Sequence, residues 1–387
     1  MAPYIGGFAQ LLADKGYTGQ TIRAELKAVG SLGRWLQAEQ VEVANLTEEV
    51  IAGFYEFRRT AGYRKPYSHQ TFRWLLEFLT TSGVVVPLVR EVTAVDLLIE
   101  AYRSWLTDTR GLATPTVLRY ESLARRFCEE QATLRGDDFL GSLSASDLTG
   151  FLLREANRVS VGAAKGRVAE VRSLSRFLYV ARLTETNLAA AVPPVAGWRD
   201  TSVPKAVPST HVDKMLAALD AEECLRDRAI LTLVARLGLR SIEVSRLELG
   251  DIDWRSGELV VRGKARRQDK MPMPTEVGEV ISAYLLRARP STESRRVFMT
   301  SKAPIKPIRA DLVSDVARRA CERAGIRRVG AHRLRHSLAT EMLRRGVTLP
   351  DISQVLRHSD LATTAIYAKV DIEGLRSVVQ PWPGTAK

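Results

Sequence analysis

Three of the five histidines in this chain lie between residues 332 and 358, and a tyrosine follows them closely. The three are His332, His336 and His358, and Tyr367 stands nine residues beyond the last of them. Arg335 comes three residues after His332, so the two side chains share a face if a helix begins near residue 332. A guanidinium can bind phosphate oxygens through two N–H bonds, and a phenol becomes a nucleophile once it is activated. Groups of these kinds can act on a phosphate, but taken singly none of these positions establishes a function.

A metal site is the main alternative for His332 and His336, which stand at positions i and i+4. Zinc hydrolases place an acidic residue between or near such a pair. Here Arg333 and Arg335 lie between the two histidines, and two guanidiniums would oppose the binding of a cation. We therefore expect no metal and no other cofactor.

Two basic residues further upstream are candidates for the same site. Arg240 follows a predicted helix end and Gly238, but it could simply be a surface arginine paired with Glu243. Lys264 is predicted at the tip of a hairpin turn, Gly263-Lys264, where most lysines are only solvated. Neither position indicates chemistry by itself.

Taken together, these positions resemble a known catalytic set. The order and spacing of six residues are similar to those of the tyrosine recombinase, or phage integrase, family: Arg240, Lys264, His332, Arg335, His358 and Tyr367. Twenty-four residues separate the first two, and twenty-three separate Arg335 from His358. The sequence motifs around these residues also match the family pattern, namely Gly-Leu-Arg-Ser-x-Glu-Val, Gly-Asp-Ile-Asp-Trp, His-Arg-Leu-Arg-His-Ser-Leu-Ala-Thr and Thr-Thr-x-x-Tyr. The resemblance is firm over residues 209–370 and looser over 93–191.

The chain departs from the family pattern at two positions. Arg357 stands where the family usually has glycine before the histidine, and Ala265 follows the lysine where glycine is common. Both lie beside candidate catalytic positions, so they could adjust DNA contact or rate without removing a required group.

The resemblance implies DNA strand cleavage without a metal. Tyr367 would attack a phosphodiester to give a 3′-phosphotyrosine and a free 5′-hydroxyl, while Arg240 and Arg335 would stabilise the charge on the non-bridging oxygens. The phosphoester bond energy would be retained, so ATP would not be needed. In this scheme Lys264 protonates the departing 5′ oxygen, and His332 acts as base toward the tyrosine. The remaining histidine, His358, would hydrogen-bond the phosphate.

The family resemblance also implies the partners. The protein would act as a homo-tetramer on two double-stranded DNA sites, and accessory recombinases or DNA-bending proteins could take part. We expect a site-specific recombinase or integrase that serves a mobile element. Two alternatives are a non-catalytic DNA-binding relative and a DNA-relaxing enzyme of the type IB topoisomerase kind.

The composition agrees with a polyanionic partner. The net charge is +13, and residues 209–387 hold 32 Lys and Arg against 22 Asp and Glu. A basic excess of this kind favours nucleic acid. Neither a membrane-spanning run nor a signal peptide is predicted, so we expect a cytoplasmic protein without a membrane partner. The three cysteines are too far apart for a disulfide framework or zinc knuckle, and we expect reduced, buried thiols: Cys128, Cys224 and Cys321.

The elements that must position the site are mostly helices. Apolar residues at spacings of three and four predict two helical domains, at 1–90 and 93–191, and their similar order suggests an internal duplication. Four prolines in sixteen residues predict a linker over 192–208. Residues 209–387 would form the catalytic domain, and the second helical domain would be the DNA-gripping core-binding domain. The predicted fold class is mainly α, with a small antiparallel β-sheet in the catalytic domain.

Within the catalytic domain, three short strands are predicted at 252–254, 258–261 and 270–273. The predicted helices span 209–219, capped by Ser209, and then 226–237, 275–288, 309–324, 332–345, 349–357 and 361–369.

Two segments each allow two interpretations. The first domain has candidate DNA-facing groups that could equally be solvated or core residues: Arg34, Trp35, Arg58, Arg59, Arg64, Lys65, Arg73 and Trp74. The C-terminal tail carries apolar residues that could dock on a neighbouring subunit or on their own domain: Leu375, Val378, Val379 and Trp382.

Overall fold

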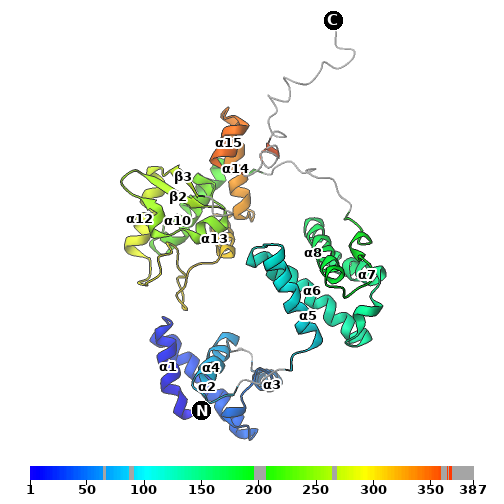
Figure 1. The fold of residues 1–387 in the computed structure, drawn as a ribbon. Helices are drawn as coiled ribbons and strands as arrows, with labels where there is room; N and C mark the ends of the chain where they lie inside the picture. The colour runs from blue at the N-terminus through cyan, green and yellow to red at the C-terminus, as the bar shows by residue number, and fades with distance from the viewer. Residues whose placement is uncertain are drawn as a thin grey trace. The chain divides into compact units, whose positions relative to one another are not determined.

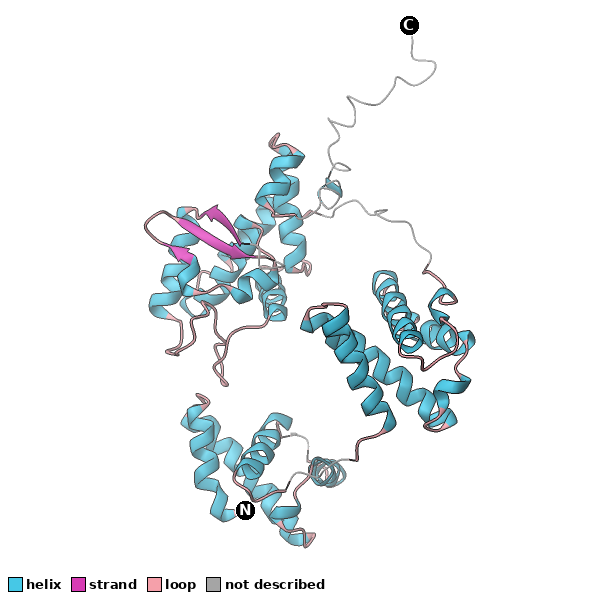
Figure 2. Ribbon diagram, viewed as in Figure 1, coloured by secondary structure: helices cyan, strands magenta, loops and turns pink. Residues whose placement is uncertain are grey.

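The chain is built mainly of α-helices with one three-stranded antiparallel sheet, which confirms the predicted fold class (Figures 1 and 2). The computed structural model describes residues 1–63, 67–86, 91–195, 206–263, 268–358, 364, 366 and 367. Within that part of the chain, no helix is long and apolar enough to cross a membrane.

The N-terminal segment folds around its own core. Its helices are α1 (Ile5–Asp14), α2 (Gly19–Ala38), α3 (Glu48–Thr60) and α4 (His69–Thr81), with short 3-10 turns at Ala2–Tyr4 and Val43–Asn45. Thr47 caps α3, because its hydroxyl accepts a hydrogen bond from the Val50 N–H at 3.2 Å. The core is aromatic and aliphatic, and includes Phe8, Leu32, Phe54, Phe72 and Leu75.

Residues 91–195 form a second helical segment with a separate core. Its helices are α5 (Ala94–Ser104), continued by a π-helical turn at Trp105–Thr109, then α6 (Thr114–Arg135), α7 (Ala145–Ala156) and α8 (Val161–Val180), with 3-10 turns at Phe139–Ser142 and Leu188–Ala190. The buried side chains include Ile99, Tyr102, Phe127, Phe151, Leu174 and Phe177.

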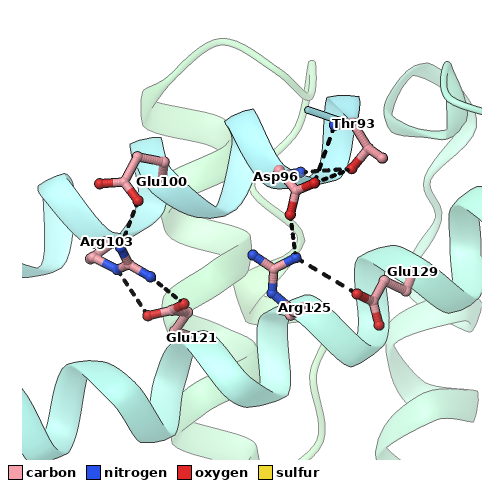
Figure 3. Close-up of polar contacts among 7 residues, drawn as sticks. All are labelled: Thr93, Asp96, Glu100, Arg103, Glu121, Arg125 and Glu129. Carbon is pink, nitrogen blue, oxygen red and sulfur yellow. Dashed lines mark hydrogen bonds and ion pairs between the residues drawn. The ribbon is translucent and has the colours of Figure 1, made fainter. Parts of the chain in front are cut away.

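Partly buried ion pairs join α5 to α6 (Figure 3). Arg103 donates to Glu121 at 2.6 and 3.0 Å, and Arg125 on α6 donates to Asp96 at 2.6 Å. Asp96 also completes a capping box with Thr93 at the start of α5. These contacts fix the first helix pair of this segment.

The C-terminal segment combines helices with the sheet. Its helices are α9 (Ser209–Ala217), α10 (Leu225–Leu237), α11 (Ser241–Arg246), α12 (Thr275–Arg287), α13 (Ala310–Arg323), α14 (Ala331–Arg344) and α15 (Leu349–Val355), with 3-10 turns at Glu222–Cys224 and Leu249–Asp251. Strands β1 (Ile252–Asp253), β2 (Glu258–Arg262) and β3 (Gln268–Pro272) pair in the order β1-β2-β3, drawn in magenta in Figure 2. Nine of the thirteen residues of α10 are buried in the core of this segment.

Some boundaries differ from the prediction. Ser209 is the first residue of α9 rather than its cap, and no side chain caps this helix, because Pro208 occupies the N-cap position. Trp254 falls in a turn after β1 rather than in the strand. All three cysteines are buried and free, as expected.

Several predictions concern residues outside the described part. They include Lys264 with its turn, Ala265, Arg64 and Lys65, the middle of the linker (196–205), most of the predicted helix 361–369 and the whole C-terminal tail. The four predicted ranges (1–90, 93–191, 192–208 and 209–387) and the duplication of the first two remain predictions.

Candidate active site

A glycine turn between α10 and α11 delivers the first arginine. Gly238 ends α10 with a φ of 60°, in the left-handed region that favours glycine. A Cβ at this position would lie 2.7 Å from Leu356 Cδ2 and 3.1 Å from Leu338 Cδ2, so the packing also requires glycine. The turn places Arg240 at the N-cap of α11.

Glu243 holds Arg240 through both its backbone and its side chain. The Arg240 N–H donates to Glu243 Oε2 at 2.8 Å, and Nη1 donates to Oε1 at 2.6 Å. The pairing that the sequence offered as an alternative is therefore present. However, the Glu243 side chain is buried whereas that of Arg240 is 37% exposed, so the guanidinium remains accessible to a ligand.

The second arginine ties three helices together. Arg335 on α14 is buried, and its two Nη groups donate to the backbone oxygens of Gly238 and Leu356. Burial lowers the pKa of Arg335 to about 10, and the neighbouring charges of Arg240 and Arg357 add to this effect. Arg335 is still charged at neutral pH, and crowding of like charges favours the binding of an anion nearby.

The three histidines of the sequence cluster are neutral at pH 7. His332 and His336 lie on one face of α14, with ring centroids 4.3 Å apart. Partial burial, followed by nearby charges, lowers the pKa of His332 and lowers those of His336 and His358 to about 4. His358 follows α15, and its Nδ1 lies 2.7 Å from Thr364 Oγ1. Neutral imidazoles can both accept and donate hydrogen bonds.

Tyr367 is buried at the end of the described chain. It packs in a small cluster with Ala339, Ile352 and Leu356, and burial raises the pKa of its phenol. Its Oη lies 2.6 Å from His336 Nδ1, and its ring is nearly parallel to that of His358, with centroids 6.5 Å apart.

The sequence indicated His336 only as a rejected metal ligand and Glu243 only as a surface partner of Arg240, and it predicted neither the contact with Tyr367 nor the contact with Arg357. The available signal for His336 was its place one turn after His332 on the same helix face. A tyrosine contact could not be read from the sequence, because it depends on how the chain returns after α15.

Four of the six predicted site residues lie around the turn at 356–358: both arginines donate to it, His358 ends it and Tyr367 packs against Leu356. His332 contacts the ring of His336, which is bonded to Tyr367, and Lys264 lies outside the described residues. Arg240 and Arg335 both donate to the turn that precedes His358, through the oxygens of Arg357 (3.1 Å) and Leu356 respectively. Over the described ranges, no group of three or more His, Cys, Asp or Glu side chains is placed to hold a metal ion.

Comparison with known proteins identifies the family. The phage integrase family model matches residues 205–373. An integrase/recombinase of Sinorhizobium fredii, y4rA, is 38% identical over all of this chain and 96% of its own length. Tyrosine recombinase XerD of Mycobacterium tuberculosis is 32% identical over 74% of this chain and 96% of its own length.

Solved structures agree on the fold. XerH bound to its palindromic difH substrate matches 75% of this chain and 97% of its own, with a TM-score of 0.54 and 18% identity. A lambda integrase dimer bound to a COC′ core site matches 87% of this chain and 89% of its own, with a TM-score of 0.55 and 15% identity. The chain belongs to the phage integrase family. Within it, the relatives above are integrases and tyrosine recombinases, the class that carries out site-specific DNA recombination.

Proposed function

We propose that this protein cleaves and rejoins double-stranded DNA at specific sites through a covalent 3′-phosphotyrosine at Tyr367. The observation that carries the proposal is the network around residues 356–358, to which both arginines are bonded and next to which the tyrosine packs. Membership of the integrase family and a net charge of +13 support DNA as the substrate.

The two arginines would stabilise the pentavalent transition state. Arg240 reaches solvent, and Arg335 is fixed by two carbonyls, so both charges are oriented before DNA arrives. Such pre-organised donors gain in effect where charge develops during the reaction. His358 would hydrogen-bond the same phosphate as a neutral imidazole.

In the cleavage step, Tyr367 Oη forms a bond to phosphorus and the P–O5′ bond breaks. The phenol proton leaves Oη, with His332 proposed as its acceptor, and Lys264 is proposed to protonate the 5′ oxygen. Attack by a 5′-hydroxyl from a second duplex reverses these steps and releases Tyr367. The sequence of bonds made and broken balances without ATP or a metal ion.

The Tyr367 phenol is held in a buried position, and attack on a phosphate requires its Oη to leave that position. The phenol is hydrogen-bonded to His336 rather than open to a phosphate. The phenol pKa is above its usual value near 10 and that of His336 is about 4, so a proton would not pass between them in this state. We therefore propose that DNA binding draws the tyrosine out of this cluster.

Action as a homo-tetramer on paired DNA sites, with or without accessory recombinases or DNA-bending proteins, is part of the same proposal. A role in a mobile element is supported by chain length. The alignment covers 96% of XerD but only 74% of this chain, whereas y4rA aligns over all of it. The additional part fits a protein that recognises more than a recombinase core alone.

Covalent trapping tests the proposal. Wild type and Tyr367→Phe are incubated in EDTA with a nicked suicide substrate made from the DNA ends of the element, then denatured and separated on a gel. A protein–DNA adduct that forms with wild type and is absent from the variant would support the nucleophile and the independence from metal. Specific binding without an adduct would favour an accessory DNA-binding protein instead.

A second assay separates recombination from DNA relaxation. Supercoiled plasmids with two target sites or none are incubated with the protein. A recombinase yields exchanged products only from the two-site plasmid, whereas relaxation of the site-free plasmid would indicate a topoisomerase-like activity.

A further inference from the structure

Arg357 has a backbone conformation that costs energy for an arginine. Its φ is 55°, in the left-handed region where glycine is favoured. For a residue with a Cβ this conformation brings the side chain close to the following carbonyl oxygen, so it is strained. The side chain is nevertheless kept in the protein interior, only 5% exposed, where its two terminal nitrogens are hydrogen-bonded and its Nε is not.

The Arg357 guanidinium is bonded to the acid that also holds Arg240. Its Nη2 lies 3.0 Å from Glu243 Oε2, while Nη1 donates to the Val355 oxygen at 3.0 Å and lies 3.3 Å from Met271 Sδ on β3. The Arg357 backbone oxygen accepts a hydrogen bond from Arg240 Nη2 at 3.1 Å. One residue therefore contacts Arg240 directly through its carbonyl and indirectly through Glu243.

The charges in this group do not cancel. Glu243 is a single buried carboxylate between two guanidiniums, and its pKa is below its usual value although burial alone would raise it, because of the Arg240 N–H and the charges of Arg357 and Arg240. Arg240 and Glu243 alone would form a neutral pair. With Arg357 present, the three groups carry one net positive charge. Arg240 is the member of the three whose side chain is exposed to solvent.

We propose that Arg357 is a positioning residue that shares Glu243 with Arg240, so that Arg240 keeps a net positive charge for the scissile phosphate. The same side chain pins the Leu356-Arg357-His358 turn against α11 and β3. That turn supplies the oxygens that hold Arg335 and Arg240, and it ends in His358. The inference rests on the proposed DNA cleavage.

Three substitutions of Arg357 separate charge from packing. Arg357→Met keeps the stem and removes the charge. Arg357→Lys keeps a positive charge but loses the pair of Nη groups that bond Val355 and Glu243. Arg357→Gly removes the whole side chain and relieves the backbone strain, so the loss of contacts is partly offset in stability. Each is compared with wild type for the rate of adduct formation at saturating suicide substrate and for its melting temperature.

We expect Arg357→Met and Arg357→Gly to form adduct roughly 10- to 100-fold more slowly, by analogy with the loss seen when residues that orient metal ligands are removed. Arg357→Lys should recover a substantial part of the rate. The glycine variant should be at least as stable as the methionine variant, but it should not form the adduct faster than the methionine variant does. Wild-type cleavage by either uncharged variant would overturn the proposal. So would rates that follow melting temperature across the three variants, because that pattern describes a packing residue.

DNA binding provides a readout that does not depend on cleavage. In a Tyr367→Phe background, the affinity for duplex DNA is measured against salt concentration with and without Arg357→Met. Each phosphate neutralised contributes about 0.9 to the magnitude of the slope of log affinity against log salt concentration. The Arg357→Met variant should therefore show a slope smaller by about 0.9, equivalent to one phosphate contact. An unchanged slope would refute the inference, even in a protein that binds DNA but proves unable to cut it. Absence of a wild-type adduct would instead count against the proposed function.

Discussion

Gly238 is the residue at which the fold and the candidate site are most tightly linked, and Gly238→Ala gives a quantitative test. An alanine with a φ of 60° costs roughly 1–2 kcal/mol from backbone strain. Its Cβ would also lie 2.7 Å from Leu356 Cδ2, and Leu356 is fully buried. Overpacking of this kind costs about 1–3 kcal/mol. The expected loss in the free energy of unfolding is therefore about 2–5 kcal/mol.

Gly257 provides the matched control in the same segment. It has a similar φ of 65°, and a Cβ there would meet nothing within 4 Å. Gly257→Ala should therefore show the strain cost alone, and the difference between the two variants isolates the clash with Leu356. Because the same leucine carries the oxygen that binds Arg335, only Gly238→Ala should also slow adduct formation.

Hydrogen exchange followed peptide by peptide suits this comparison, because a chain with several cores is not expected to unfold in one step. Peptides from α10 and α14 should exchange faster in Gly238→Ala than in Gly257→Ala, while peptides from α5 to α8 should be unchanged in both. Equal protection of α10 and α14 in the two variants would refute the steric argument.

Three further predictions concern His336, the histidine pair and the second helical segment. His336→Leu removes the hydrogen bond that holds Tyr367, worth about 1 kcal/mol, so adduct formation should rise up to about fivefold; a slower rate would instead make His336 a base in the reaction. The pKa values of His336 and His358 are about 4, below their unfolded values, so the unfolded state binds more protons and stability should fall as pH drops from about 6.5 to 4. Melting temperatures measured across this range should decline less in a His336→Gln His358→Gln double variant, and equal declines would contradict this linkage. Glu155 is buried and pairs with the Arg126 guanidinium at 2.9 Å, so Glu155→Ala should destabilise residues 91–195 by about 1–3 kcal/mol. Hydrogen exchange of peptides from α6 and α7 measures this loss, and Glu129→Ala, at an exposed position, serves as the neutral control.

The sequence by itself determined most helices of the catalytic segment, the three-stranded sheet and the family, because these depend on local patterns, but it did not predict α11. Apolar spacing located α10 and α14 to within a few residues, and Gly238 was identified as the end of α10. The order and spacing of the basic, histidine and tyrosine residues pointed to the integrase family, which the comparisons confirmed.

Only the tertiary structure decided which groups touch. Glu243 lies 114 residues from Arg357 in the chain, and His336 lies 31 residues from Tyr367. No local pattern encodes such pairs, because they form where separate elements pack together. For the same reason the sequence could identify Arg357 as a departure from the family pattern but could not assign it a partner. The effect of its charge depends on Glu243, the carboxylate that the fold buries between Arg357 and Arg240.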